Sequence, residues 1–101
     1  MSLAALAEQF RTRLVSAPSL NAKVLFDCGD EGQVFVDATQ HPPVLNNMMV
    51  DEPVLTLSAS LETFENILSG QQDPNFAYMM GKLKVKGPLG LAMKLNGILE
   101  G

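Results

Sequence analysis

Hydrophobic residues follow a helical spacing near both ends of the chain and a strand spacing over much of the stretch between them. Before Pro18, four apolar residues recur at intervals of three or four positions and predict an amphipathic N-terminal helix: Leu3, Leu6, Phe10 and Leu14. Residues 23–28 and 33–39 are β-branched and aromatic runs on either side of the turn sequence Gly29-Asp-Glu-Gly32. This arrangement predicts a β-hairpin.

The middle of the chain gives a weaker pattern. The Pro42-Pro43 pair excludes regular strand pairing, and residues 44–50 fit either a short strand or a turn. Residues 53–59 alternate again and predict a strand. Ser60 then fits the cap of a helix that ends at Gly70, whose buried stripe is formed by Leu61, Phe64 and Leu68.

The last third of the chain packs three predicted elements into few residues. Asp73 and Pro74 suit the start of a short helix that ends at Gly81. Lysines at 82, 84 and 86 alternate with Leu83 and Val85, which is the period of a strand with one solvent-exposed face. After Gly87-Pro88, an apolar helix follows with a buried stripe at Leu89, Ala92, Leu95 and Ile98/Leu99. Consecutive strands followed by helices predict an α+β fold, with a sheet covered by helices on one face.

Length and cysteine content bound the class of protein. A chain of 101 residues and 10.9 kDa predicts one domain over residues 1–101. Cys28 is the one cysteine, so an internal disulfide is excluded and a reducing compartment is favoured. The chain has no long apolar run and no signal-peptide pattern, which predicts a soluble, cytoplasmic protein that is not exported.

Charge and hydropathy narrow the choice of partner. The net charge is −4, and the lysine row at 82, 84 and 86 is the one basic cluster, so we expect no nucleic-acid partner. Apolar residues make up 47% of the chain and charged residues only 18%. Either the core is very full, or part of it surrounds a ligand.

Candidate catalytic groups are few and isolated. His41 precedes the two prolines without a second histidine or a cysteine beside it, and a lone Cys28 in a strand is typical of a small buried hydrophobe. Gly87-Pro-Leu-Gly90 is too short for a phosphate-binding loop. We therefore predict no enzyme activity, no metal and no cofactor. A hydrolase or thioesterase would have to rely on Cys28 or His41, and this interpretation has little support.

Each of three features allows two interpretations. The five internal methionines either fill gaps in the core or line a lipid cavity: Met48, Met49, Met79, Met80 and Met93. The lysine row is either a solvated strand face or a surface that attracts anionic head groups. Asn96 either faces water or points inward, where it would hydrogen-bond the polar end of a ligand.

A run of motifs adds a resemblance. Its members are Leu68-Ser-Gly70, Asp73-Pro-Asn-Phe-Ala77, Gly81-Lys-Leu-Lys84 and Gly87-Pro-Leu-Gly-Leu-Ala-Met-Lys-Leu-Asn96. Together they closely resemble, in register, the pattern of the sterol carrier protein 2 family. The strong part covers residues 56–99, whereas the N-terminal helix matches only in position.

The resemblance implies a five-stranded, mostly antiparallel sheet covered by helices on one face, with an internal hydrophobic tunnel. It also implies non-covalent binding of a fatty acid, a fatty acyl-CoA or a sterol-like lipid. On matching positions it nominates ten ligand-binding residues: Phe64, Leu68, Phe76, Met80, Leu89, Leu91, Met93, Leu95, Asn96 and Ile98.

The leading functional hypothesis is intracellular carriage of a lipid, with transient membrane contact compatible with it. The alternative is an accessory or interaction domain of a larger lipid- or quinone-metabolising enzyme or complex, in which the cavity is vestigial. The sequence leaves the lipid and the oligomeric state open.

Overall fold

A computed structural model describes residues 2–17 and 20–100 of the chain. In chain order its elements are α1 (Leu3–Ser16), β1 (Lys23–Asp27), the 3-10 turn η1 (Gly29–Glu31), β2 (Gln33–Asp37), β3 (Val44–Asn46), β4 (Leu55–Ser58), α2 (Leu61–Leu68), α3 (Pro74–Met79), β5 (Lys84–Lys86) and α4 (Leu89–Glu100). No helix in these described ranges is long and apolar enough to cross a bilayer.

The strands form one sheet in the order β3-β2-β1-β4-β5. β1 and β2 are the predicted hairpin, with Leu25 opposite Phe35. β4 pairs parallel to β1, and the other three pairs are antiparallel. The prediction of an α+β fold with a five-stranded, mostly antiparallel sheet is therefore confirmed.

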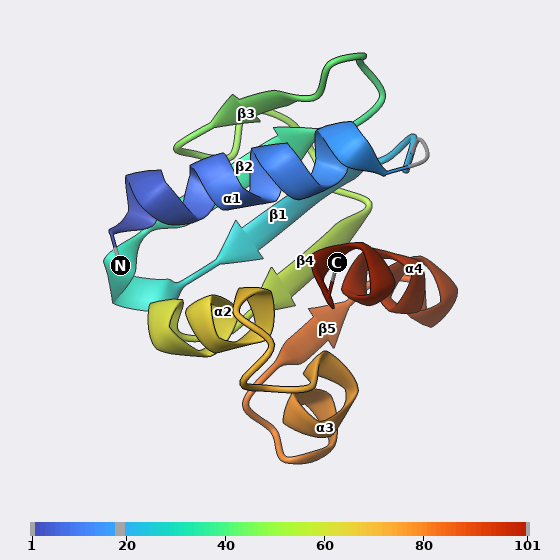
Figure 1. The fold of residues 1–101 in the computed structure, drawn as a ribbon. Helices are drawn as coiled ribbons and strands as arrows, with labels where there is room; N and C mark the ends of the chain where they lie inside the picture. Colours follow the sequence, from blue (N-terminus) through green and yellow to red (C-terminus); the bar gives the residue numbers. More distant parts are fainter. Residues whose placement is uncertain (1, 18–19, 101) are drawn as a thin grey trace.

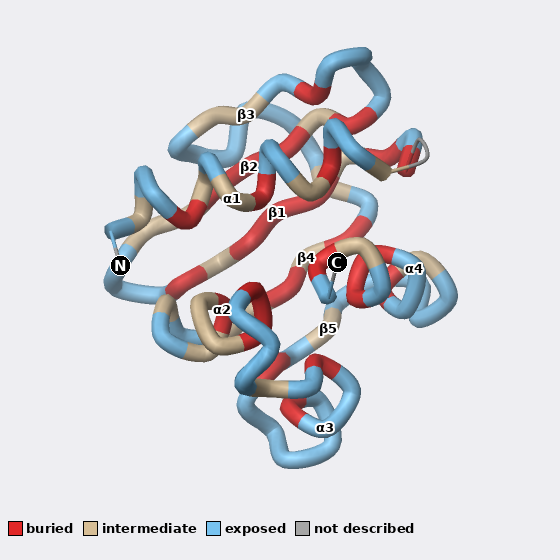
Figure 2. Tube along the Cα trace, viewed as in Figure 1, coloured by how far each residue is buried: buried red, intermediate tan, exposed pale blue. Residues whose placement is uncertain are grey.

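Helices α1, α2 and α4 lie over the same face of this sheet, and α3 lies beyond the β5 edge (Figure 1). Alternate strand residues turn toward the helical layer and are buried, among them Val24 and Phe26 in β1 and Leu55 and Leu57 in β4. Burial runs along the three central strands and along the inner sides of the helices (Figure 2). The core therefore lies between the sheet and the helical layer.

Three phenylalanines fill the centre of this core. Phe10 of α1 stacks on Phe26 of β1 with ring centroids 3.9 Å apart and an interplanar angle of 15°. Phe64 of α2 meets both rings edge-on at 5.7 Å. The cluster joins two helices to the central strand, and these edge-on contacts are the geometry that aromatic quadrupoles favour.

The opposite face of the sheet is covered by the connection between β3 and β4 rather than by helices. Leu25 and Phe35 point to this face, yet they are buried. β3 and β4 lie on opposite sides of the hairpin, so the connection between them must cross it. Lys23, which shares the face of Leu25, forms an ion pair with Asp51 in that connection, so the connection crosses on this side.

Several of the predicted helix signals are confirmed. The Ser60 side chain accepts a hydrogen bond from Thr63 N, and Asp73 accepts one from Asn75 N, with Pro74 at the first helical position. The ambiguous residues 44–50 contain a short edge strand, β3, at 44–46.

Some predicted boundaries and one buried position were wrong. β5 begins at Lys84, so Lys82 and Leu83 belong to the turn that follows α3. Leu89, predicted in the buried stripe of the last helix, is 55% exposed, because α4 buries Ala92, Leu95, Asn96 and Leu99 instead.

Gly87 joins β5 to α4 at a point of close backbone approach. Its φ is +133°, and a Cβ there would lie 2.6 Å from the Val54 carbonyl oxygen and 3.1 Å from Leu55 Cα. Both neighbours are backbone atoms, so a side chain could be accommodated only by moving β4 away from β5.

Gly87→Ala should lower the free energy of unfolding by about 2–4 kcal/mol, through strain and displaced backbone. Gly90→Ala is the matched control, since a Cβ at Gly90 meets nothing within 4 Å. It should be neutral or stabilise the protein by up to about 1 kcal/mol through helix propensity. Chemical denaturation measures both; equal stability of the two variants would contradict the close approach.

Candidate functional site

The candidate site is built around α4, whose composition is apolar on almost every side. Its buried residues face the sheet and the other helices, and the helix contacts α1, α2, α3 and β4. A helix with so few polar side chains is covered on most sides or lines an apolar ligand site.

The ten nominated residues do not converge on one cavity. Four are buried: Phe64, Leu68, Leu95 and Asn96. Two are half-buried, Leu91 and Ile98. Four are exposed: Phe76, Met80, Leu89 and Met93. The tunnel that the resemblance implied is not shown by the described residues, because the interior near Phe64 is occupied by the phenylalanine cluster.

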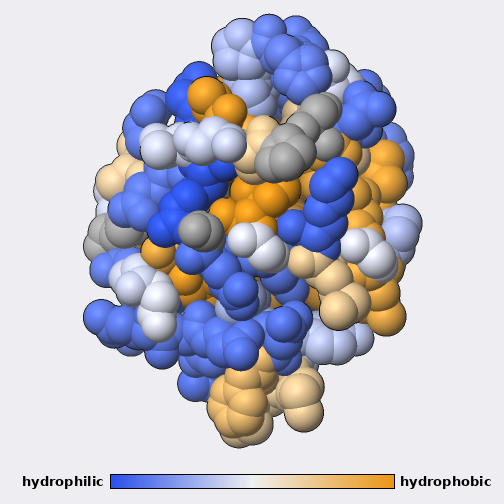
Figure 3. Space-filling view, turned by 45° about the vertical axis from the view of Figure 1, so that its right-hand side comes forward, coloured by the Kyte–Doolittle hydropathy of each residue, from blue (hydrophilic) through white to orange (hydrophobic). Residues whose placement is uncertain are grey.

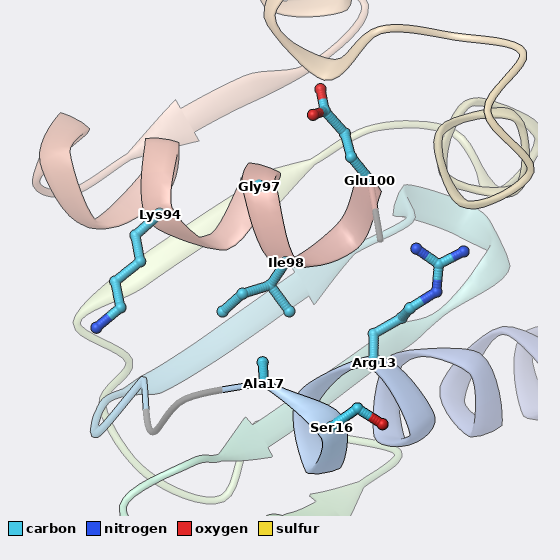
Figure 4. Close-up of a pocket in the computed structure, with 7 residues that line it drawn as sticks. All are labelled: Arg13, Ser16, Ala17, Lys94, Gly97, Ile98 and Glu100. Atoms are coloured by element: carbon cyan, nitrogen blue, oxygen red, sulfur yellow. The ribbon is translucent and has the colours of Figure 1, made fainter.

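A surface groove of about 680 Å³ lies between the end of α1 and the last turns of α4. Its lining residues are Arg13, Ser16, Ala17, Lys94, Gly97, Ile98 and Glu100. Ile98 and Ala17 point toward each other across its middle, with Arg13 at one end and Lys94 at the other (Figure 4). Apolar atoms are visible in the hollow on this face, with hydrophilic residues around them (Figure 3). Of the nominated residues, only Ile98 borders this groove.

Arg13 fastens the end of α4 to the rest of the helical layer. Its two terminal nitrogens donate hydrogen bonds to Leu99 O, at 2.5 Å, and to Leu68 O, at 2.6 Å. These carbonyls end α4 and α2, where a cation interacts favourably with the helix dipole and with acceptors that lack intrahelical donors. One side chain of α1 therefore holds the ends of two other helices.

Asn96 points inward, which resolves the alternative that it faces water. The residue is only 4% exposed, and its Oδ1 has no hydrogen-bond partner within residues 2–17 and 20–100. A buried polar atom without a partner costs about 1–3 kcal/mol, so such atoms usually accept a hydrogen bond from bound water or a ligand. Asn96 is thus a polar acceptor set among apolar neighbours.

Two observations bear on nucleophilic and metal chemistry in the part of the chain that the structure describes. Burial, together with the nearby carboxylates of Glu31 and Asp27, raises the pKa of the Cys28 thiol to about 11. Where the chain is described, no three His, Cys, Asp or Glu side chains come together to hold a metal.

Reasoning from sequence missed the groove between α1 and α4. Arg13 follows Phe10 by three positions and adjoins the apolar stripe of the first helix. A cation placed next to a buried stripe was the available signal, but its two acceptors lie 55 and 86 residues away in the chain.

Comparisons with known proteins give a family match, partial relatives and structural neighbours. The family model described as the SCP-2 sterol transfer family matches residues 4–100. Peroxisomal multifunctional enzyme A of Dictyostelium discoideum is 38% identical over 50 residues, and hydroxysteroid dehydrogenase-like protein 2 of Bos taurus is 39% identical over 50 residues. Each alignment covers 50% of this chain but only 11% and 12% of those proteins.

Among solved structures, the solution structure of palmitated SCP2L2 from Aedes aegypti superposes with a TM-score of 0.75. The superposition covers 100% of this chain and 96% of that one, at 18% identity. At this identity the likeness extends to the fold.

Cys28 should be almost unreactive in the native protein. At pH 8 a thiol with a pKa of about 11 holds roughly a hundredfold less thiolate than an ordinary exposed cysteine. We expect a disulfide reagent such as DTNB to react slowly with the native protein and rapidly after addition of guanidinium chloride. Equal rates in the two states would show that Cys28 is accessible and activated.

Proposed function

Because the chain belongs to the SCP-2 sterol transfer family, for which lipid binding or transfer is the supported activity, we propose that it binds a single-chain lipid without covalent chemistry and carries it in the cytoplasm. The observation that carries the proposal is the Oδ1 of Asn96, which is buried in a largely apolar helix and has no hydrogen-bond partner among the described residues. It is an acceptor without a donor, and the hydroxyl or protonated acid group of a lipid is such a donor.

The proposed ligand lies between α4 and the sheet, among the buried and half-buried members of the nominated set. These are Phe64, Leu68, Leu91, Leu95, Asn96 and Ile98. The exposed members, Phe76, Met80, Leu89 and Met93, would reach such a lipid only if α3 and α4 turned inward. The groove beside Ile98 is the proposed entrance, since it leads from solvent to the last turns of α4.

Entry requires α4 to separate from α1, because the phenylalanine cluster fills the centre of the core. The contact to be broken is the one between Arg13 and the Leu99 carbonyl. About fifteen methylenes at about 0.8 kcal/mol each give roughly 12 kcal/mol of gross stabilisation. Ordering the lipid and opening the helical layer offset much of it, which leaves micromolar to nanomolar affinity and loose selectivity for chain length.

The palmitated relative supports an acyl chain as the ligand class, since the same fold holds palmitate in that protein. The names of the other two relatives support a second candidate function. One is named a multifunctional enzyme and the other a dehydrogenase-like protein, and this chain matches only a small part of each. In this second candidate function the chain would be an accessory domain of a larger protein of that kind. Co-purification of a larger enzyme with the tagged protein would favour this candidate over a free carrier.

Purified protein should bind a fluorescent fatty acid, and palmitate should displace it with a dissociation constant in the micromolar range or below. Native mass spectrometry should show one lipid per chain. A protein that takes up neither the probe nor any lipid from cell extract would contradict the proposed carriage.

Asn96→Leu should raise the free energy of unfolding of the lipid-free protein by about 1 kcal/mol, because it removes a buried acceptor that has no donor. The same change should weaken binding of a fatty acid by about two- to tenfold and leave binding of its methyl ester unchanged. Asn47→Leu, at an exposed position, is the control and should change neither quantity. Equal losses for acid and ester would contradict the role of Asn96 as an acceptor.

A further inference from the structure

In helix α3 the large apolar side chains are exposed and the small ones are buried, which reverses the usual distribution. Its buried residues are small, Pro74 and Ala77, whereas Phe76, Met79 and Met80 are 54%, 80% and 60% exposed. These three lie at positions i, i+3 and i+4 and so share one face, which we call the α3 apolar face. Large apolar groups gathered on one exposed face indicate an interaction site rather than scattered surface residues.

Two backbone hydrogen bonds and two buried side chains hold α3 with its apolar face turned outward. The amides of Lys82 and Leu83 both donate to the Ala77 carbonyl, at 2.9 and 3.2 Å. Ala77 and Leu83 are almost fully buried on either side of this turn. The exposure of the apolar face is therefore built into the turn between α3 and β5.

The lysine row, Lys82, Lys84 and Lys86, follows α3 directly in the chain, in the turn after α3 and in β5. All three are exposed, and β5 is an edge strand with α3 beside it (Figure 1). Val85 packs against the core, so Lys84 and Lys86 project from the other side of the edge. Apolar atoms form the α3 end of the molecule, below a band of hydrophilic residues (Figure 3).

The basic and acidic residues are unevenly distributed along the chain. Residues 74–99 contain four lysines and no aspartate or glutamate, whereas residues 1–73 contain three basic and ten acidic residues. A protein with a net charge of −4 is repelled by an anionic surface unless its cations are gathered on one side. Three of these four lysines lie in the turn and edge strand that follow α3, whereas Lys94 lines the groove between α1 and α4.

We propose that the β5 edge, formed by the α3 apolar face and the lysine row, docks on the surface of an anionic lipid bilayer. Phe76, Met79 and Met80 enter the interface between head groups and acyl chains, while the lysines extend to the phosphates and carboxylates of the head groups. This proposal rests on the proposed function and extends it, because a docked carrier could take up and release its lipid at the bilayer. Docking is nevertheless measured separately from lipid uptake.

A bilayer fits these features better than an acidic protein does. The apolar residues are two flexible methionines and one aromatic ring on an exposed helix, side chains that adapt to an irregular apolar medium. Asp30, Glu31 and Glu62 line the same hollows as Lys82, so part of the charge of Lys82 is offset. Lys84 borders one of these hollows and Lys86 neither, so Lys86 carries the clearest test.

The experiment is flotation of the intact protein with vesicles of phosphatidylcholine alone, or with about 30% phosphatidylserine. We expect binding only to the anionic vesicles, with an affinity that falls as salt is raised. Lys84→Gln with Lys86→Gln should weaken binding by more than tenfold, since each lysine near an anionic surface contributes about fivefold, equivalent to about 1 kcal/mol. Met79→Ser with Met80→Ser should also weaken binding by more than tenfold.

The matched controls lie elsewhere on the surface. Met48→Ser with Met49→Ser removes two methionines of similar exposure, 61% and 51%, from the β3–β4 connection, and Arg11→Gln removes a cation of α1. Both should bind like the unmodified protein. Circular dichroism must show that every variant remains folded.

Any of three results would overturn the proposal. The first is absence of binding to anionic vesicles, including the case in which the β5 edge instead joins two copies of the chain in light scattering. The second is binding that the β5-edge variants leave unchanged. The third is an equal loss of binding in the controls. Uptake of a fluorescent fatty acid without vesicles separates the two proposals. If uptake fails, the carrier function is lost and docking is unaffected. If uptake succeeds but the protein does not bind vesicles, docking is lost and the carrier function remains.

Discussion

The contact between Phe10, Phe26 and Phe64 is the constraint on which the rest of the structure depends. It joins α1 and α2 to the central strand through rings 3.9 and 5.7 Å apart, so the helical layer has one fixed distance from the sheet. Interiors packed this closely resist small changes of volume. Space for a ligand must therefore come from α4, the one helix over the sheet that contributes no ring to this cluster.

The two ends of α4 are held by interactions of different kinds. At its start, Gly87 brings the backbone against Val54 and Leu55, where no side chain can be inserted. At its end, one cation of α1 donates to the Leu99 carbonyl beside a groove open to solvent. A single side-chain hydrogen bond beside solvent is easier to exchange for water than a close backbone contact is to separate. Separation of α4 from α1 should therefore begin at its C-terminal end.

Local patterns predicted the elements well, because each depends on neighbouring residues. The hairpin, the caps at Ser60 and Asp73 and the order of the elements could be predicted from spacing and from residue type alone. The parallel pairing of β1 with β4 could not be predicted from local patterns, because pairing between distant segments leaves none. The resemblance implied only that the sheet would be mostly antiparallel. The same limit explains why Arg13 was missed, as its acceptors are defined only once α2 and α4 are packed.

The family resemblance also failed to separate residues that line an interior from residues that are exposed at an edge. Phe64 and Phe76 were nominated on the same grounds, yet Phe64 is fully buried and Phe76 is more than half exposed. The difference comes from Ala77 and Leu83, which anchor α3 by its small side and leave its large residues outside. A sequence shows that a helix is apolar, but which of its faces is covered depends on the turn that follows it. In this chain that turn places methionines and lysines on one edge, so an excess of apolar residues that suggested an oversized core belongs in part to the surface.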